Sequence, residues 1–210
     1  CRRSGNDFAA TLGYPIGDIA ACVALLDDDF GADRTIDLGR ANGTWFCSVT
    51  ATGFDSEASR WANGVSRLSG TSLYVAAVLR TLATYKPHPM RVTVDGEVHE
   101  LRAWMVSVGN GTRYGGGMLI TPNATLDDGI FDVCAIDAVS RPRFLANFPK
   151  VFKGTHLGVD GVHTWRGRVV TIESLDPSVP IEVYADGDRV GPLPATIECV
   201  AEALTVRVPR

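Results

Sequence analysis

Residues 90–108 of the 210-residue chain read MRVTVDGEVHELRAWMVSV, and this stretch decides the fold class. Two runs rich in valine, threonine and aromatic residues, 90–94 and 98–108, flank the pair Asp95-Gly96. An Asp-Gly pair between two such runs is a strong signal of a type I′ turn, whose two central residues both take positive φ. The stretch therefore predicts a β-hairpin.

Short runs of similar composition recur on both sides of this hairpin, separated by Gly, Pro and Asp turns. The predicted strands are Arg34–Leu38, Trp45–Thr52, Gly129–Ile136, Trp165–Leu175, Pro180–Ala185, Ala195–Val200 and Leu204–Val208. Helices are predicted over Asp7–Leu12, Asp18–Leu26 with Asp18 as the N-cap, Leu73–Leu82 and Arg141–Phe148. Many short strands with few helices indicate an α+β, mainly β fold arranged as a two-layer sandwich, not a parallel doubly wound sheet.

Composition excludes several classes of protein. The net charge of −4 with scattered Lys and Arg argues against a nucleic-acid partner, which usually requires a clustered basic surface. The longest apolar runs, such as 19–26, fall well short of the roughly 20 residues that span a bilayer, so membrane contact is expected to be peripheral. Five isolated cysteines without a C-x-x-C pair indicate neither a disulfide framework nor a zinc site.

Four acidic features in glycine turns or at the end of a strand are the main candidates for chemistry. They are Asp7, Asp37, the pair Asp127-Asp128 and the triplet Asp186-Gly187-Asp188. Taken singly, each is most simply a turn former, because Asp bonds its own backbone and Gly accepts positive φ. The triplet places two carboxylates one residue apart, where both could face one site for metal binding or proton abstraction. The run 115–117, Gly-Gly-Gly, lacks the Lys-Ser/Thr of a P-loop and is interpreted as a flexible or tightly packed loop.

A longer pattern carries a family resemblance. Residues 115–133 read GGGMLITPNATLDDGIFDV, and this string resembles the lipid kinase family that contains bacterial diacylglycerol kinases, sphingosine kinases and ceramide kinases. Further matching motifs follow the same order along nearly the whole chain. They are SGNDFA at 4–9, IDLG at 36–39, TGFD at 52–55, VFKGTH at 151–156 and DGD at 186–188.

The resemblance implies a domain organisation. Members of that family have an N-terminal α/β nucleotide-binding domain with a Gly-Gly-Asp-Gly-Thr loop, followed by a β-sandwich domain, and that loop does not occur in this sequence. By resemblance, residues 1–30 are a remnant of the nucleotide-binding domain. Residues 31–190 form the β-sandwich lipid-substrate domain, and residues 191–210 form strands that return towards the nucleotide domain.

The resemblance also implies roles at the nucleotide and the substrate. Ser4, Gly5 and Asn6 match a Gly-Thr-Gly-Asn-Asp motif that contacts ATP, with Ser4 in place of the usual threonine. Asp188 matches the proton acceptor, where the family usually has glutamate. The other members of the implied acidic network, which positions catalytic Mg²⁺ and the γ-phosphate, are Asp7, Asp37 and Asp186.

A second, structural Mg²⁺ is implied on the long string. The side chain of Asp128 and the carbonyls of Thr125 and Ile130 match its ligands. Oxygen-only ligation suits Mg²⁺.

These matches imply an ATP-dependent lipid kinase that phosphorylates a free hydroxyl of a lipid such as diacylglycerol, cytoplasmic and peripherally associated with the membrane. A catalytically diverged module that binds lipid or a protein partner is the alternative, motivated by Asp188 in place of glutamate and by the missing nucleotide loop. A kinase for a soluble substrate, as in NAD kinases, is disfavoured because it does not account for the string at 115–129. The lipid's identity is not specified by the sequence, and a homodimer remains open.

Overall fold

The computed structural model describes residues 6–63 and 71–210, which form mainly β structure. Two short helices come first, α1 (Asp7–Thr11) and α2 (Ile19–Ala24). Asp18 caps α2 by accepting a hydrogen bond from the Ala21 amide at 2.9 Å, which satisfies one of the free N–H groups of the first turn. Both predicted helices and the predicted cap are confirmed, with slightly shorter helices than expected.

The strands form one large antiparallel sheet. They are β1 (Gly31–Ala41), β2 (Thr44–Phe46), β3 (Val49–Gly53), β4 (His88–Val94), β5 (Glu97–Gly109), β6 (Phe131–Asp137), β7 (Val162–Gly167), β8 (Val169–Ser174), β9 (Glu182–Ala185), β10 (Asp188–Pro192) and β11 (Ala195–Pro209). Their order is β10-β9-β3-β5-β4-β8-β11-β1-β2, with β6 paired to β5 and β7 paired to β6. The sheet curls until β2 lies against β9. The mainly β, sandwich-like class is thus confirmed, although hydrogen bonding continues from one layer into the other.

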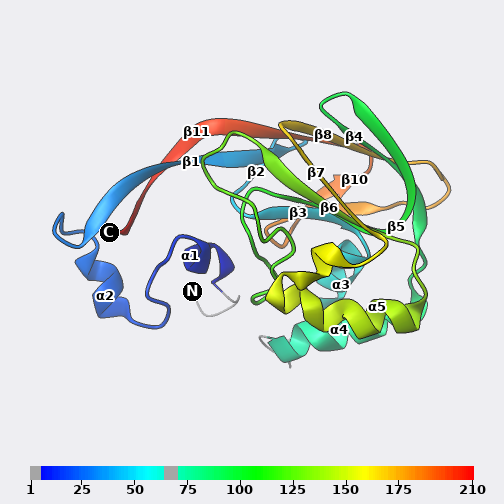
Figure 1. Ribbon diagram of the computed structural model, residues 1–210, viewed down its shortest axis with the longest axis horizontal. Coiled ribbons are helices and arrows are strands. Elements are labelled where there is room, and N and C mark those ends of the chain that lie inside the picture. The colour runs from blue at the N-terminus through cyan, green and yellow to red at the C-terminus, as the bar shows by residue number, and fades with distance from the viewer. Residues whose placement is uncertain (1–5, 64–70) are drawn as a thin grey trace.

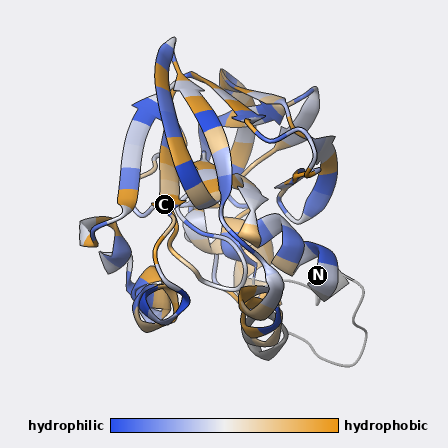
Figure 2. Ribbon diagram, turned by 90° about the vertical axis from the view of Figure 1, so that its right-hand side faces the viewer, coloured by the Kyte–Doolittle hydropathy of each residue, from blue (hydrophilic) through white to orange (hydrophobic). Residues whose placement is uncertain are grey.

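The predicted hairpin lies at the centre of this sheet. Strands β4 and β5 pair from His88–Ala103 to Val94–Glu97, and the turn residues Asp95 and Gly96 have φ of 47° and 91°. Strand β5 also pairs with β3 and β6, so its second half is covered on both sides and buried from residue 103 to 109. Figure 2 shows the long strands banded alternately hydrophobic and hydrophilic, as expected for strands with one face on the core.

Two predicted strands are each divided in two. The run 165–175 breaks between β7 and β8, where the Asp95 carboxylate accepts hydrogen bonds from the amides of Arg168 and Val169 at 3.0 and 2.8 Å. The run 45–52 breaks between β2 and β3 at Cys47 and Ser48, whose amides also bind a distant carboxylate. At both breaks, carboxylates therefore accept hydrogen bonds from backbone amides. In a continuous strand these amides would have bonded to a neighbouring strand.

At the C-terminal end of the chain, two predicted strands are joined into one. The predicted strands 195–200 and 204–208 are one continuous strand, β11, which pairs with β1 along its length. The register shifts between Ile36 and Leu38, and Glu202 on β11 has a φ of 52°. The polar and alanine-rich residues 201–203 are therefore an irregularity within the ladder, not a turn.

Helices cover one side of the sheet. They are α3 (Phe54–Asn63), α4 (Thr71–Thr84), α5 (Arg141–Asn147) and the 3₁₀ turns Phe148–Lys153 and Thr155–Gly158. Figure 1 shows α3, α4 and α5 grouped beneath the sheet, away from α1 and α2. Helices α4 and α5 were predicted, whereas α3 was not. In the part of the chain that the structure describes, no helix is long and apolar enough to cross a membrane.

The hydrophobic core of the described residues has three clusters: one inside the curled sheet, one between the sheet and its helices, and a small one around Ile36 and Leu126. Met90, Val92, Ile172 and Ile197 are fully buried in the first cluster. The second is centred on Trp104, whose Nε1 donates to the Val139 carbonyl at 2.9 Å, so the buried indole leaves no unpaired donor.

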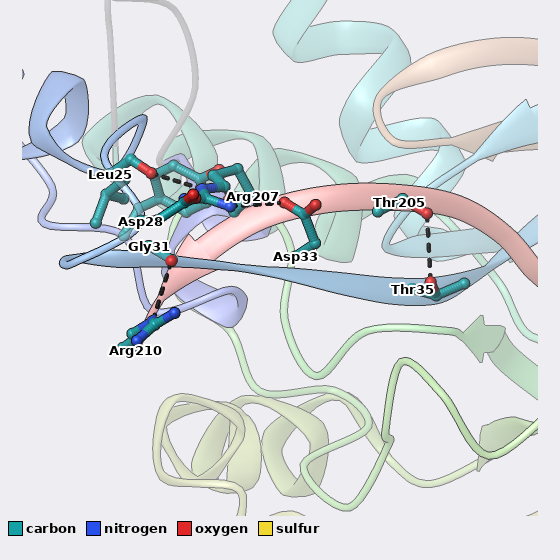
Figure 3. A network of polar contacts seen from close by, with 9 residues as sticks. Leu25, Asp28, Gly31, Asp33, Thr35, Thr205, Arg207 and Arg210 are labelled. Carbon is teal, nitrogen blue, oxygen red and sulfur yellow. Dashed lines mark hydrogen bonds and ion pairs between the residues drawn. The ribbon is translucent and has the colours of Figure 1, made fainter.

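The end of the β1–β11 ribbon is fastened to α2 by a polar network (Figure 3). Arg207 on β11 donates to the Leu25 carbonyl at 2.8 Å and pairs with the carboxylates of Asp28 and Asp33. Arg210 donates to the Gly31 carbonyl at 3.2 Å. These contacts join residues near the two ends of the described chain.

The close approach of β1 and β2 gives a test of this packing. Gly39 faces Phe46, and a Cβ at position 39 would lie 2.0 Å from the Phe46 ring. We expect Gly39→Ala to lower the free energy of unfolding by about 1–3 kcal/mol or more, since overpacking forces a buried ring to move. Denaturant unfolding checks this, with Gly158→Ala as the control because no heavy atom lies within 4 Å of its Cβ position. Equal effects of the two substitutions would contradict the packing described.

Candidate functional site

Asp37 on β1 is buried and binds two separate backbone segments. Only 2% of the residue's surface is exposed to solvent. Its Oδ2 accepts from the Gly129 amide at 2.7 Å and its Oδ1 accepts from the Glu202 amide at 2.8 Å. The Asp37 amide in turn donates to the Leu126 carbonyl at 2.6 Å. This carboxylate therefore attaches the 126–129 loop to the β1–β11 pair.

Asn110, at the end of β5, extends this network. It is fully buried, and its Nδ2 donates to the carbonyls of Asp37 at 2.9 Å and Cys47 at 3.0 Å. None of the catalytic or metal-binding motifs in the sequence includes this residue. Its position directly after a predicted central strand, where a buried amide can bridge neighbouring strand ends, is the signal that could have found it.

Asp186 binds the same region from the β9–β10 turn. Its carboxylate accepts hydrogen bonds from the amides of Cys47 at 2.6 Å, Ser48 at 3.0 Å and Val49 at 3.0 Å. The residue has a φ of 49°, which Asp tolerates better than most residues. Burial, and secondarily the negative charge of Asp186, raise the pKa of the Cys47 thiol, so this thiol stays protonated near neutral pH.

Asp7 on α1 binds the glycine loop. Its Oδ2 accepts a hydrogen bond from the Gly116 amide at 2.8 Å. Positive φ values of 61°, 86° and 103° at residues 115–117 explain why three glycines occur here. In this arrangement a loop amide contacts a carboxylate of the protein itself, which agrees with the interpretation of 115–117 as a packed loop.

The remaining predicted nucleotide and catalytic residues lie at two places. Asp188 begins β10 with an exposed side chain, two residues beyond Asp186. Asn6 precedes α1 with a φ of 54°, and Ser4 and Gly5 lie outside the described residues. The structure thus connects Asp37 and Asp186 through Asn110 and Cys47 and connects Asp7 to the glycine loop. The catalytic and nucleotide-binding roles of all these residues stay predictions.

The residues expected to hold a structural Mg²⁺ do not fit that ion as they are arranged. Oδ2 of Asp128 forms an ion pair with the Arg166 guanidinium, and Oδ1 accepts from the Ile130 amide at 3.3 Å. Thr125 and Asp128 line one shallow pocket together with Arg166.

A narrow apolar pocket lies between the sheet and its helical layer. Its walls come from α3, α4 and α5, the two 3₁₀ turns, strands β5, β6 and β7, and the residues on either side of the three glycines. The lining includes Phe54, Val78, Met105, Tyr114, Met118, Ile120, Ile136, Val139, Phe144, Phe148, Val151, His156 and Val162. Tyr114 and Met118 flank the glycine loop that Asp7 contacts, so one loop borders both the pocket and the Asp7 carboxylate.

His156 is a buried polar residue in this mainly apolar pocket, whose lining also includes Asp55, Arg143, Asn147 and Asp160. It is 2% exposed, and its Nε2 lies 3.1 Å from the Ile120 carbonyl, to which it can only donate. Its Nδ1 has no protein partner. Burial lowers the pKa of His156, while the hydrogen bond to Ile120 opposes that shift, so the ring is neutral near pH 7.

The buried carboxylate of Asp37 yields a stability prediction. Asp37→Asn replaces an acceptor of two amide hydrogen bonds by a group with one acceptor oxygen, so one donor loses its partner. We expect the free energy of unfolding to fall by about 1.5–3 kcal/mol, the usual range for hydrogen bonds to charged groups. Chemical denaturation measures it, with the exposed Asp29→Asn as the matched control. A loss no larger than that of the control would refute the described role of Asp37.

Burial of His156 predicts a pH dependence of stability. Its folded pKa is below the ordinary value of 6.5, so below about pH 6.5 the unfolded chain binds a proton that the folded chain resists. The contribution is present above that pH and is lost as the pH falls, with a slope of up to about 1.4 kcal/mol per pH unit. His156→Gln should flatten the loss of stability between roughly pH 7 and 5 relative to wild type. The more exposed His163→Gln is the control, and an unchanged slope in His156→Gln would contradict the assignment.

Comparison with known proteins identifies the family. The YegS C-terminal NAD kinase beta sandwich-like domain matches residues 48–208. The diacylglycerol kinase of Mycobacterium tuberculosis strain H37Rv is 41% identical over 99% of this chain and 67% of its own length, and that of Bacillus subtilis strain 168 is 24% identical over 98% of this chain and 66% of its own length.

Among solved structures, one of a candidate diacylglycerol kinase from Bacillus anthracis strain Sterne superposes with a TM-score of 0.72 at 27% identity, covering 95% of this chain and 64% of that one. The chain therefore spans about two thirds of the length of these relatives. With its curled antiparallel sheet and the matched residues 48–208, the chain belongs to the family of YegS C-terminal NAD kinase beta sandwich-like domains.

Proposed function

We propose that this chain is the substrate-side part of an ATP-dependent lipid kinase, which transfers the γ-phosphate to a free hydroxyl of a lipid such as diacylglycerol. The relatives named as diacylglycerol kinases support this proposal. The reaction belongs to the whole protein, of which this chain spans about two thirds by comparison with those relatives. Because the acceptor lipid resides in a bilayer, the proposal includes peripheral contact with the membrane surface.

The observation that carries the proposal is the apolar pocket beside the glycine loop. A lipid acceptor needs an apolar site for its chain and a polar site for its hydroxyl within a short distance. The pocket offers the first through side chains such as Phe54, Met105 and Phe144, and the loop 114–118 connects it to Asp7.

Asp188 is the proposed proton acceptor for the lipid hydroxyl. Its side chain is exposed at the start of β10, next to the turn that Asp186 attaches to β3. Three backbone amides donate hydrogen bonds to the Asp186 carboxylate and so hold the β9–β10 turn in place. Asp188 follows directly after this turn. When bound, ATP with Mg²⁺ supplies the phosphoryl group and neutralises the charge that develops during transfer.

We also propose the domain division that the sequence predicts. Residues 1–30, with α1 and α2, would belong to a nucleotide-binding domain, and residues 31–190 would bind the lipid. Residues 191–210 would return to the first part. The polar contacts of Arg207 with Leu25 and Asp28 support a connection of this kind, because they join β11 to the segment after α2.

The first experiment measures phosphate transfer from γ-labelled ATP with Mg²⁺ into lipid by the full-length protein and its Asp188→Asn variant. We expect labelled lipid from the wild type and a loss of at least about a hundredfold in the variant, since general-base catalysis contributes on the order of 10² to 10⁴ in rate. Normal ATP binding without any labelled lipid would instead favour the alternative of a catalytically diverged lipid-binding module.

A second substitution tests the pocket itself. Val162→Phe extends a wall side chain into the pocket, so it should shorten the alkyl chain that can be accommodated. We expect kcat/KM to fall at least about tenfold for long-chain diacylglycerol and to change much less for a short-chain analogue. Val169→Phe, on the exposed face of β8, is the matched control. An equal effect on both chain lengths would place the acyl chain elsewhere.

A further inference from the structure

Arg166 is placed beside two carboxylates by strand register. In the β6–β7 ladder Arg166 lies directly opposite Asp132, and its Nε is 3.3 Å from Asp132 Oδ2. A terminal nitrogen of the same guanidinium pairs with Asp128 Oδ2. One arginine therefore links β7, β6 and the loop that precedes β6.

That loop is itself held in a defined position. The Gly129 amide binds the buried Asp37, so the preceding Asp128 cannot move far from β6. The neighbouring Asp127 is also paired with an arginine, because Arg34 on β1 donates to its Oδ2 at 2.9 Å. Both carboxylates of the Asp127-Asp128 pair are thus matched by guanidinium groups from different strands.

We propose that Arg166 is the resident cation of this loop and takes the place of the divalent ion that the family resemblance assigns to Asp128. A guanidinium offers several donors in a fixed plane and can bind two carboxylates at once. It thereby supplies the same cross-link between the loop and the sheet that an ion bound to Asp128 would supply. This cross-link belongs to the folded chain alone and does not require the proposed kinase activity.

Competition between the two cations follows from charge and geometry. Mg²⁺ requires near-octahedral oxygen ligands at about 2.0–2.1 Å and gives up its waters reluctantly. To reach Asp128 it would have to displace the guanidinium, which the strand register would still keep close to the ion as a positive charge. Of the two acids, Asp132 is the more buried: its side chain is 14% exposed against 29% for Asp128. Burial raises the pKa of Asp132, and the charge of Arg166 opposes that shift.

The test measures the melting temperature of the full-length protein without nucleotide, in saturating MgCl₂ and in EDTA, for wild type, Arg166→Gln, Asp128→Asn and the double variant. For each background, the Mg²⁺-induced rise in melting temperature is measured with Asp128 and with Asn at position 128. The difference between the two rises is the part that depends on Asp128. This subtraction removes ions bound at other sites. Arg168→Gln, an exposed arginine two residues further along, is the matched control.

In the wild type we expect no Asp128-dependent rise in melting temperature with Mg²⁺. In EDTA we expect Arg166→Gln to melt about 2–4 °C below the wild type. In Arg166→Gln, Mg²⁺ should restore stability through Asp128. A saturable Mg²⁺-induced rise in wild type that Asp128→Asn abolishes would overturn the proposal, since the ion would then displace the arginine. The proposal would also be overturned if Arg166→Gln lowered the melting temperature in EDTA no more than Arg168→Gln does.

Discussion

The buried carboxylate of Asp37 is the interaction on which the organisation of the site depends. It accepts backbone hydrogen bonds from Gly129 and Glu202, two residues far apart in the chain. A polar side chain this well buried is tolerated only when hydrogen bonds replace its water. Its partners must therefore stay in place, and they hold the loop before β6 and the irregular point of β11 in fixed positions.

The same use of aspartate recurs around the sheet. Asp186 receives the amides between β2 and β3, and Asp95 receives those between β7 and β8. In each case a carboxylate from a turn binds donors at a break in another strand. These aspartates thus have a structural role that is independent of any catalysis. Asp186 and Asp188 are both exposed residues, and the carboxylate of Asp186 is the one that binds the amides between β2 and β3.

Local signals were sufficient for the hairpin at Asp95-Gly96, for the Asp18 cap and for most strands, because each depends on neighbouring residues. The breaks after Phe46 and Gly167 could not be predicted, since they depend on carboxylates more than 70 positions away. Among the candidate site residues, the motifs directed attention to Asp37 and Asp128. Asn110 and Arg166 lack such motifs, and their roles come from strand ends and strand register that only the folded sheet defines.

The pairing of β1 with β11 has a consequence for how the chain acquires its structure. Gly31 is matched with Pro209, so the ladder closes across almost the entire described sequence. Loop closure over such a separation is entropically costly and makes folding slow. During synthesis on the ribosome β1 emerges before β11 and gains this partner only after residues 197–209 have been added. Until then it presents an unpaired edge, which makes the nascent chain a natural client for chaperones.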